Sequence, residues 1–225
     1  IPESSLDKWD FYTVSKYCNE VIPDGKGGHE ARFSLNLYMS SRSEVFDAIN
    51  ELSSAFRGIS YYGAGSFILN QDSPSDSQYS LNPSNVVGGV FTYSGSSQKA
   101  RHTTATVAWQ DYDLLGEVQH EYVEDADGVS RYGIINKTTK AVGCYSQGQA
   151  HRFGEWLLLS EQNLTETVTF GVSVESGIVL SPGMVIDIAD PVKSGKRRGG
   201  RISSASTTVI TVDNETDLDS VDQSN

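Results

Sequence analysis

The residues best suited to acid–base or nucleophilic chemistry lie together in one stretch, at Ser146, His151 and Glu155. A serine activated by a histidine, with a carboxylate to orient that histidine, is the arrangement used by many hydrolases. Ser146 and His151 are five residues apart, so they do not lie squarely on one helix face, and no acid is placed to orient the histidine. The pattern therefore predicts a helix cap and a packed helix rather than a catalytic set.

The other histidines and the two cysteines do not have the spacing of a metal site. His120 and Glu121 are neighbours in an expected strand, so their side chains point to opposite faces of a sheet. No CxxC and no paired His/Cys spacing occurs, which argues against zinc. We expect Cys18 and Cys144 to be free, buried thiols, because two cysteines in 225 residues make no disulfide framework. We expect no cofactor.

The acidic run Glu124–Gly128, with the sequence EDADG, superficially resembles a calcium-binding loop. An EF-hand loop needs a further ligand before its glycine and a glutamate at its end, and both are missing. Asp127 followed by Gly128, between two expected strands, is typical of a hairpin turn. The sequence therefore predicts a turn here rather than a calcium site.

One basic segment stands out in an acidic chain, whose formal net charge is −12. Its cations, within the string KSGKRRGGR, are Lys193, Lys196, Arg197, Arg198 and Arg201. This segment is either a solvated hairpin tip or a docking loop for an acidic partner, such as a second copy of this chain. The overall acidic balance argues against a specific nucleic-acid binder, which must neutralise phosphates. No apolar run approaches the roughly 20 residues needed for membrane insertion.

The element that must position the central residues is a helix within the stretch Gly143–Glu161. Ser146 is expected to cap its N-terminus, and Gln149 three residues later completes a capping-box pattern. Apolar residues then recur at helical spacing, and we expect them to form one buried stripe: Ala150, Phe153 and Leu157. Strand-like segments surround this helix, so we expect one helix to pack across a β-sheet.

The whole chain is predicted to be an α+β, β-rich protein with four parts. These are residues 1–72, a helix–strand–helix–hairpin subdomain; residues 73–88, a linker; residues 89–213, a β-rich domain with the central helix; and residues 214–225, an acidic and frayed tail. The chain starts with Ile1 rather than Met, and we expect it to be a fragment of a longer protein.

Several local elements follow from capping and alternation patterns. We expect a first helix capped by Ser4 or Ser5 and ending before Pro23, and a second helix opened by a Ser41–Glu44 capping box and closed by Gly58. The predicted strands are Arg32–Met39, Ile59–Tyr62, Ser66–Leu69, Phe91–Tyr93, Arg101–Trp109, Glu117–Val123, Val129–Asn136, Leu164–Val174, Met184–Ile188 and Ser206–Val212.

Several strings, taken together and in one order, resemble the tail-tip attachment proteins (host-specificity protein J) of lambda-like long-tailed phages. The strings are DKWDFYTVSKYCNEVIPDGKGG (7–28), YSGSSQKARHT (93–103), EYVEDADGVSRYG (121–133), GCYSQGQAHRFGEWLLLSE (143–161), ETVTFGV (166–172), PGMVI and ADP (182–191) and GGRI (199–202). No single string is diagnostic, but the combination covers nearly the whole chain except its acidic end. Gln147 departs from the family, in which we expect arginine more often.

The resemblance implies the central hub region of a much longer protein, located at the virion tail tip and assembled in the cytoplasm of the bacterial host. It implies β-barrel or sandwich-like domains with flanking helices, arranged as a homotrimer that contacts other tail-tip proteins and closes the tail tube. The family assigns receptor recognition to a far C-terminal region, which this chain lacks. It has no catalytic residues to transfer.

Two other functions compete with this structural role. A receptor-binding module would use exposed aromatic residues in loops, such as Tyr61, Tyr62 and Tyr145. A cell-wall hydrolase would need paired carboxylates, a zinc site or a Cys/His pair, and the sequence has none of these patterns. We therefore expect a non-enzymatic protein.

Overall fold

The computed structural model describes residues 6–38, 44–63, 65–96, 101–194 and 202–212. The chain divides into two compact units. Unit 1 comprises residues 1–73 and 96–165, and unit 2 comprises residues 74–95 and 166–225. The chain is thus divided differently from the predicted ranges, because it leaves unit 1 near residue 73 and returns to it near residue 96.

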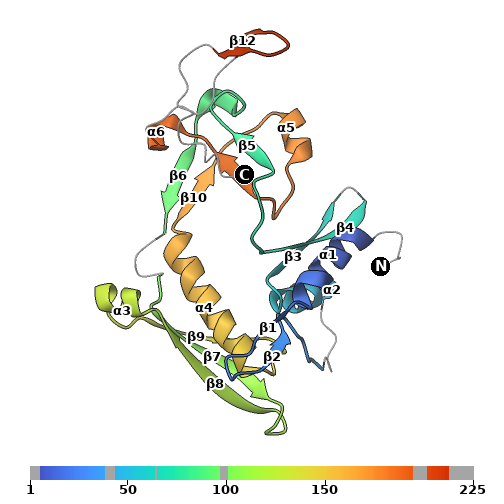
Figure 1. Ribbon diagram of the computed structural model, residues 1–225, viewed down its shortest axis with the longest axis vertical. Coiled ribbons are helices and arrows are strands. Elements are labelled where there is room, and N and C mark those ends of the chain that lie inside the picture. The colour runs from blue at the N-terminus through green and yellow to red at the C-terminus, as the bar shows by residue number, and fades with distance from the viewer. Residues whose placement is uncertain (1–5, 39–43, 64, 97–100, 195–201, 213–225) are drawn as a thin grey trace. The chain divides into compact units, whose positions relative to one another are not determined.

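The α+β, β-rich fold class is confirmed, and Figure 1 shows its elements. The helices are α1 (Lys8–Cys18), α2 (Val45–Ser54), α3 (Ala126–Tyr132), α4 (Gln147–Asn163), α5 (Val174–Val179) and α6 (Pro191–Ser194), with a short 3-10 turn η2 (Val87–Gly89). The strands are β1 (Val21–Pro23), β2 (His29–Ala31), β3 (Gly58–Gly63), β4 (Ser66–Gln71), β5 (Tyr79–Leu81), β6 (Thr92–Gly95), β7 (Thr104–Asp111), β8 (Glu117–Glu124), β9 (Asn136–Lys140), β10 (Glu166–Thr169), β11 (Ile186–Ile188), β12 (Ile202–Ala205) and β13 (Ile210–Val212). They pair into one three-stranded and five two-stranded sheets, and none of these described sheets closes on itself.

The core of unit 1 lies between helix α4 and the sheet β8–β7–β9, as the sequence predicted (Figure 1). The middle strand β7 runs antiparallel to β8 and parallel to β9. Alternate residues of a strand share one face, so one face of β7 is apolar and is covered by α4. The buried cluster consists of Ala105, Val107, Trp109, Val123, Ala141, Cys144, Ala150 and Leu158, with Phe153 and Leu157 packed against it.

Gly154 sets how closely α4 approaches the sheet. A methyl group at this position would lie 2.7 Å from Cγ2 of Val123 and 3.2 Å from Cγ2 of Val107. Real Cβ atoms do not make contacts as short as the first of these, so the helix backbone lies directly on the two valines. Glycine weakens a helix, and here that cost is offset by this close packing.

We expect the Gly154→Ala substitution to destabilise unit 1 by about 1–3 kcal/mol, because overpacking outweighs the gain in helix propensity of about 1 kcal/mol. Urea unfolding followed by tryptophan fluorescence measures this, since all three tryptophans lie in unit 1 (Trp9, Trp109 and Trp156). Leu159→Ala, on the same helix at a side chain that is 62% exposed, is the matched control and should change little. A Gly154→Ala protein as stable as the wild type would contradict the contact.

Helix α1 packs its buried Val14 side against β4, where Phe11 faces Phe67 with ring centroids 6.4 Å apart. Its N-cap is Asp7, whose carboxylate accepts a hydrogen bond from the backbone N–H of Trp9 at 3.0 Å. The first helix ends before Pro23, as predicted, and the predicted caps Ser4 and Ser5 lie outside the described residues. The helix ends at Cys18, because residues 21–23 pair with residues 29–31 as β1 and β2.

Two details of helix α2 also differ from the prediction. The helix begins after Glu44, which makes no side-chain capping bond, and the predicted cap Ser41 lies outside the described residues. Gly58 is the first residue of β3 instead of a helix cap, and the positive φ (59°) belongs to Arg57. The hairpin predicted after it is confirmed as β3–β4.

The predicted strand Arg32–Met39 is not a strand over residues 32–38, and Met39 lies outside the described residues. The alternation of apolar residues is present, but no neighbouring strand pairs with the segment. Its backbone instead bonds to a loop, since the Asn36 N–H donates to the Gly143 carbonyl at 2.9 Å. Leu35 and Leu37 are 40% and 37% exposed, so alternation does not bury them as expected.

The predicted hairpin at Asp127–Gly128 and the strand Val129–Asn136 were also wrong, because residues 126–132 form helix α3. Topology gives the reason. β9 lies on the opposite side of β7 from β8, so a tight turn after β8 cannot reach it. Helix α3 makes this crossing, and the strand starts only at residue 136.

Unit 2 holds three two-stranded sheets, one of which is the antiparallel pair β12–β13, and a thin core of buried hydrophobic side chains. β10 pairs with β6 antiparallel and β11 pairs with β5 parallel, so the predicted linker 73–88 contains a strand. The predicted strand 164–174 ends at residue 169. The buried hydrophobic side chains of the described part of this unit are Leu81 and Val86. Buried Asp190 accepts a hydrogen bond from the Tyr93 hydroxyl at 2.8 Å.

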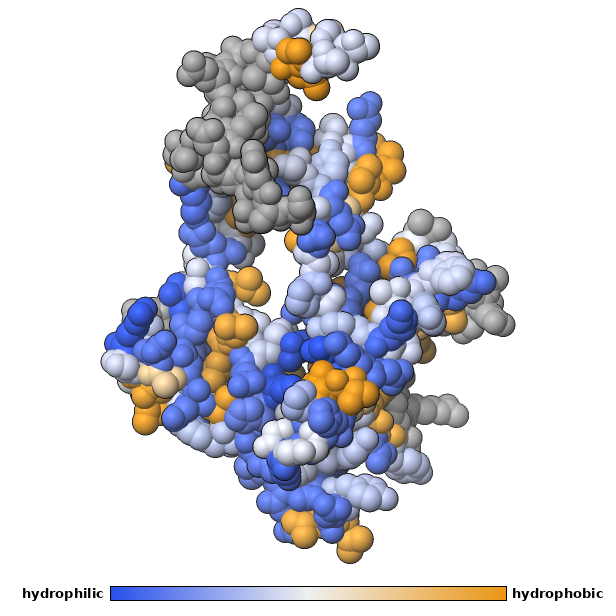
Figure 2. Space-filling view, viewed as in Figure 1, coloured by the Kyte–Doolittle hydropathy of each residue, from blue (hydrophilic) through white to orange (hydrophobic). Residues whose placement is uncertain are grey.

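On the face shown in Figure 2, most of the described residues are hydrophilic and the apolar ones form scattered patches. None of the described helices is both long and apolar enough to cross a membrane.

Candidate functional site: the surfaces around helix α4

Ser146 caps helix α4 as predicted, since its hydroxyl oxygen accepts a hydrogen bond from the Gln149 N–H at 3.3 Å. The capping box is not formed, however. The Gln149 side chain points away from the cap and bonds Ser34, accepting from its N–H at 3.1 Å and donating to its carbonyl at 3.1 Å. The amide of buried Gln149 thereby makes hydrogen bonds to the backbone of Ser34 of the kind that a neighbouring strand would make.

An ion pair next to the cap holds strand β2 against α4. Nη1 of Arg152 lies 2.7 Å from Oε1 of Glu30, and Nη2 donates to the carbonyl of Arg32 at 3.2 Å. The Ser146 hydroxyl donates to the other oxygen of Glu30. The Arg152 and Glu30 side chains are only 23% and 21% exposed. Their charged groups are therefore largely shielded from water and are stabilised by these hydrogen bonds within the protein.

His151 has a carboxylate partner, contrary to the prediction that no acid orients it. Nδ1 of His151 lies 2.9 Å from Oε1 of Glu121 on β8, and its Nε2 lies 3.5 Å from Glu155. The other oxygen of Glu121 accepts from the Gln147 amide at 2.7 Å. Sequence spacing could not reveal Glu121, because it approaches from another element.

This arrangement does not make a catalytic set. The hydrogen bonds of the Ser146 hydroxyl go to Glu30 and to the backbone of Gln149, not to His151. A nucleophile needs its base within hydrogen-bond reach, and the described contacts show no such pair. The polar groups around the N-terminal half of α4 therefore connect elements of unit 1 to one another.

The other end of α4 has a second such connection through Glu161. Its carboxylate accepts from Nζ of Lys137 at 2.6 Å and from the backbone N–H of His102 at 3.0 Å, and Nδ1 of His102 lies 2.7 Å away. Burial by itself raises the pKa of Glu161, but the hydrogen bonds from Lys137 and His102 outweigh it and hold the pKa below the ordinary value of 4.5.

Because the folded pKa is lowered, Glu161 stabilises the fold at neutral pH, and this contribution is lost as pH falls below about 4.5. We expect Glu161→Gln to cost about 1–3 kcal/mol at pH 7. The difference from the wild type should shrink as pH falls through the folded pKa. Urea unfolding at several pH values between 7 and 3 measures it. Glu155→Gln, at a side chain 60% exposed, should change stability little. A pH-independent difference would refute the role assigned to the charge.

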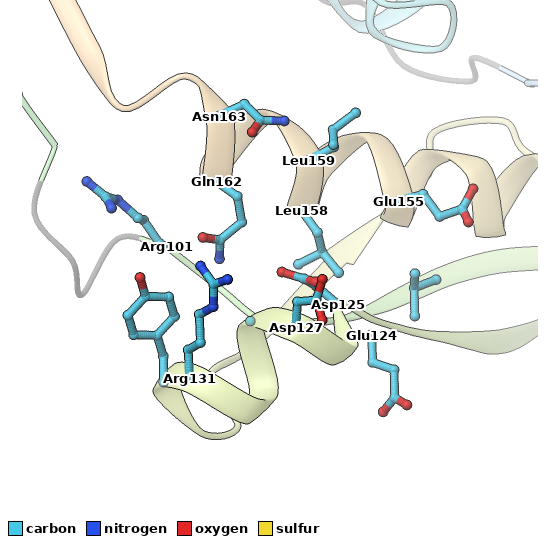
Figure 3. A pocket seen from close by; sticks show the side chains of 13 residues that line it. Arg101, Glu124, Asp125, Asp127, Arg131, Glu155, Leu158, Leu159, Gln162 and Asn163 are labelled. Carbon is cyan, nitrogen blue, oxygen red and sulfur yellow. The ribbon is translucent and has the colours of Figure 1, made fainter.

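A hollow of about 440 Å³ lies between α3 and the C-terminal half of α4 (Figure 3). We refer to it as the α3–α4 hollow. It is lined by Arg101, Val123, Glu124, Asp125, Asp127, Gly128, Arg131, Tyr132, Glu155, Leu158, Leu159, Gln162 and Asn163. Charged side chains of both signs therefore surround one opening on unit 1.

The predicted basic docking loop lies mostly outside the described residues, which exclude Lys196, Arg197, Arg198 and Arg201. The one described member, Lys193, is on α6. Its ammonium group pairs with Glu166 and lies 4.4 Å from the centroid of the Tyr93 ring. Lys193 thus has partners within unit 2, and docking by the other four cations stays a prediction.

The tyrosines considered for receptor binding lie in two places in unit 1, two on strand β3 and one before helix α4. Tyr61 and Tyr62 are on β3, where Tyr62 is 62% exposed and Tyr61 is half-buried. Tyr145 precedes α4, is 39% exposed and packs edge-on to Tyr112, with ring centroids 6.5 Å apart.

Both cysteines are free. Cys144 is buried, and burial raises the pKa of its thiol to about 11. Cys18 is half-buried, and burial also raises its pKa. Over the described ranges, no three His, Cys, Asp or Glu side chains come together as a metal site.

Comparison with known proteins gives the class. Residues 44–204, more than two thirds of the chain, match the family described as "Putative phage tail protein". The chain therefore belongs to this family of phage tail proteins.

Two curated relatives carry the name Tip attachment protein J. That of Escherichia phage SECphi27 is 33% identical over 189 residues, 84% of this chain and 16% of the relative. That of Escherichia phage SECphi4 is 31% identical over 227 residues, 96% of this chain and 19% of the relative.

The resemblance stated from the sequence strings is thus confirmed. The chain spans less than a fifth of the length of these relatives. A solved structure, "The crystal structure of the tail protein from Neisseria meningitidis MC58", matches with a TM-score of 0.39 and 12% identity, covering 64% of this chain and 43% of that chain. A likeness at this TM-score carries no argument about function.

Proposed function

We propose that this chain is a structural, non-enzymatic segment of a phage tail-tip hub, which closes the distal end of the tail tube and supports host attachment. The observation that carries the proposal is the match to two proteins named Tip attachment protein J over 84% and 96% of the chain. The polar groups around α4 agree with it, because Glu30, Glu121 and Glu161 are each bonded to groups of the chain itself.

The exposed apolar surface of unit 2 supports a role in assembly. Val174 and Ile178, one helical turn apart on α5, are 81% and 78% exposed, and Val192 on α6 is 93% exposed. Only Leu81 and Val86 are buried hydrophobic residues in the described part of this unit. Small units with so little core are usually stabilised by further contacts, and exposed apolar groups are typical of surfaces that contact another protein.

In this proposal the chain acts as a homotrimer at the virion tail tip, together with other tail-tip proteins, after assembly in the cytoplasm of the host. Host receptors are contacted through other regions of the longer protein. The role is mechanical. Helix α4 packed on the sheet β8–β7–β9 makes unit 1 a rigid body, and exposed surfaces provide the contacts between protomers.

The mass of the 225-residue chain in solution tests this proposal. Light scattering over a wide concentration range should show a trimer or a monomer–trimer equilibrium. Val174→Asp and Ile178→Asp should shift that equilibrium toward the monomer, because a charge placed in an apolar contact is costly. A strict monomer at high concentration would contradict trimer contacts within these residues.

The basic segment is a second candidate contact. Replacing Lys196, Arg197, Arg198 and Arg201 with alanine should weaken assembly and reduce its dependence on salt, because screened charge pairs between copies are lost. The mass measurement at low and high salt checks this. Unchanged assembly with unchanged salt dependence would refute docking by the loop. Lys193→Ala is a separate control, since this lysine already pairs with Glu166.

A receptor-binding module is the alternative, and the exposure of Tyr62 favours it. Aromatic residues on surfaces are typical binding anchors. If the alternative holds, the purified chain should block adsorption of a phage that carries this protein, and Tyr62→Ala should weaken that block. No competition at saturating concentrations would reject it.

A further inference from the structure

Two arginines line the α3–α4 hollow without a partner among the described residues. Elsewhere Arg32 and Arg152 each lie 2.7 Å from a glutamate oxygen. Neither Arg101 nor Arg131 forms a described ion pair or hydrogen bond, although four carboxylates line the same hollow. Nε of Arg101 is buried and has no acceptor among the residues that the structure describes. The Arg131 side chain is exposed and that of Arg101 is half-buried, so both remain accessible to an acceptor that comes from outside the chain.

Charged groups of both signs are distributed along the hollow, with Asp125 and Asp127 between Arg131 and Glu155 (Figure 3). The guanidinium groups of Arg101 and Arg131 lie at the same end as Gln162, and the carboxylate of Glu155 lies at the opposite end. Three elements supply these groups. Arg101 precedes β7, Arg131 is on α3, and Glu155 and Gln162 are on α4. Because α4 is packed firmly on the sheet, this framework holds the charged side chains around one opening.

The charges of the side chains that line the hollow restrict the charge that a ligand can carry. Two arginines face four carboxylates: Glu124, Asp125, Asp127 and Glu155. A phosphate, with nearly two negative charges, would gain from the arginines but would be repelled by these carboxylates. A guanidinium group also binds a carboxylate through two parallel hydrogen bonds. A ligand that carries one carboxylate and, nearby, one cationic group fits both ends.

We propose that the α3–α4 hollow binds a polypeptide segment of a partner protein that carries an acidic side chain next to a basic one. The acidic side chain lies between Arg101 and Arg131, where its oxygens accept hydrogen bonds from the accessible N–H groups of the two guanidinium ends. The basic side chain lies against Asp127 and Glu155. This inference extends beyond the proposed hub role, because it concerns a site within unit 1 alone and requires no trimer.

Nuclear magnetic resonance of the whole ¹⁵N-labelled chain tests the site through the Nε–H signals of Arg101 and Arg131, assigned with the Arg→Gln variants. The probe is the blocked peptide Gly-Glu-Gly-Lys-Gly. We expect both signals to shift and to saturate at millimolar peptide. The matched peptides Gly-Gln-Gly-Lys-Gly and Gly-Glu-Gly-Gln-Gly should bind about tenfold more weakly, since each lacks one charge-assisted hydrogen bond.

Variants of the chain locate the binding. Arg131→Gln should weaken the peptide about tenfold. Arg131 is exposed, so this variant should stay folded even if Arg101→Gln does not. Asp127→Asn should weaken the Glu/Lys peptide and leave Gly-Glu-Gly-Gln-Gly unchanged. Lys140→Gln removes an exposed cation from β9, outside the hollow lining, and should change nothing.

Three results would overturn the proposal: no shift of either arginine signal, equal binding of an uncharged Gly-Gln-Gly-Gln-Gly peptide, or saturation by inorganic phosphate but not by the peptide. The last result would make the hollow an oxyanion site instead. None of them bears on the mass measurement, so failure here is distinguishable from failure of the hub proposal.

Discussion

The contact between the backbone of helix α4 and two valines of the sheet is the constraint on which unit 1 depends. At Gly154 the helix lies so close to Val123 and Val107 that no side chain fits between them. This closeness places both ends of a 17-residue helix at defined positions relative to the sheet. The ion pairs and hydrogen bonds at those ends require that placement, because charged groups bond only over short distances and in narrow geometries.

Three glutamates illustrate how the placement is used. Glu30 reaches α4 from β2, Glu121 reaches it from β8, and Glu161 reaches out from α4 to Lys137 on β9. Each carboxylate has at least two partners. Residues whose types could support catalysis are therefore occupied in connecting elements. For a protein of a tail family, whose work is mechanical in our proposal, such cross-connections resist movement of the helix along the sheet.

The two units differ in how they are stabilised. Unit 1 has a contiguous buried cluster between a helix and a sheet. The described part of unit 2 has few buried apolar groups and several exposed ones on its short helices. Unit 1 therefore has the properties of a rigid body. Unit 2 has those of a unit that is stabilised by contacts with another protein. The α3–α4 hollow is a different kind of surface, since its polar groups are held in place by the rigid body.

Local elements with strong, self-contained signals could be predicted from the sequence. Ser146 with the apolar stripe after it identified helix α4, and alternation identified β7 and β8. The order of the sequence strings identified the phage tail family. Capping and side-chain periodicity depend on residues a few positions apart, so they can be read without the fold.

Tertiary structure alone decided which residues from distant elements meet. Glu121 beside His151, and Gln149 bonded to Ser34 instead of completing a capping box, depend on how α4 lies on the sheet. Residues 126–132 became a helix because the chain had to cross to the far edge of β7, although Asp127–Gly128 locally favours a hairpin. In each case a long-range contact outweighed a weak local preference, and the sequence does not record such contacts as spacing.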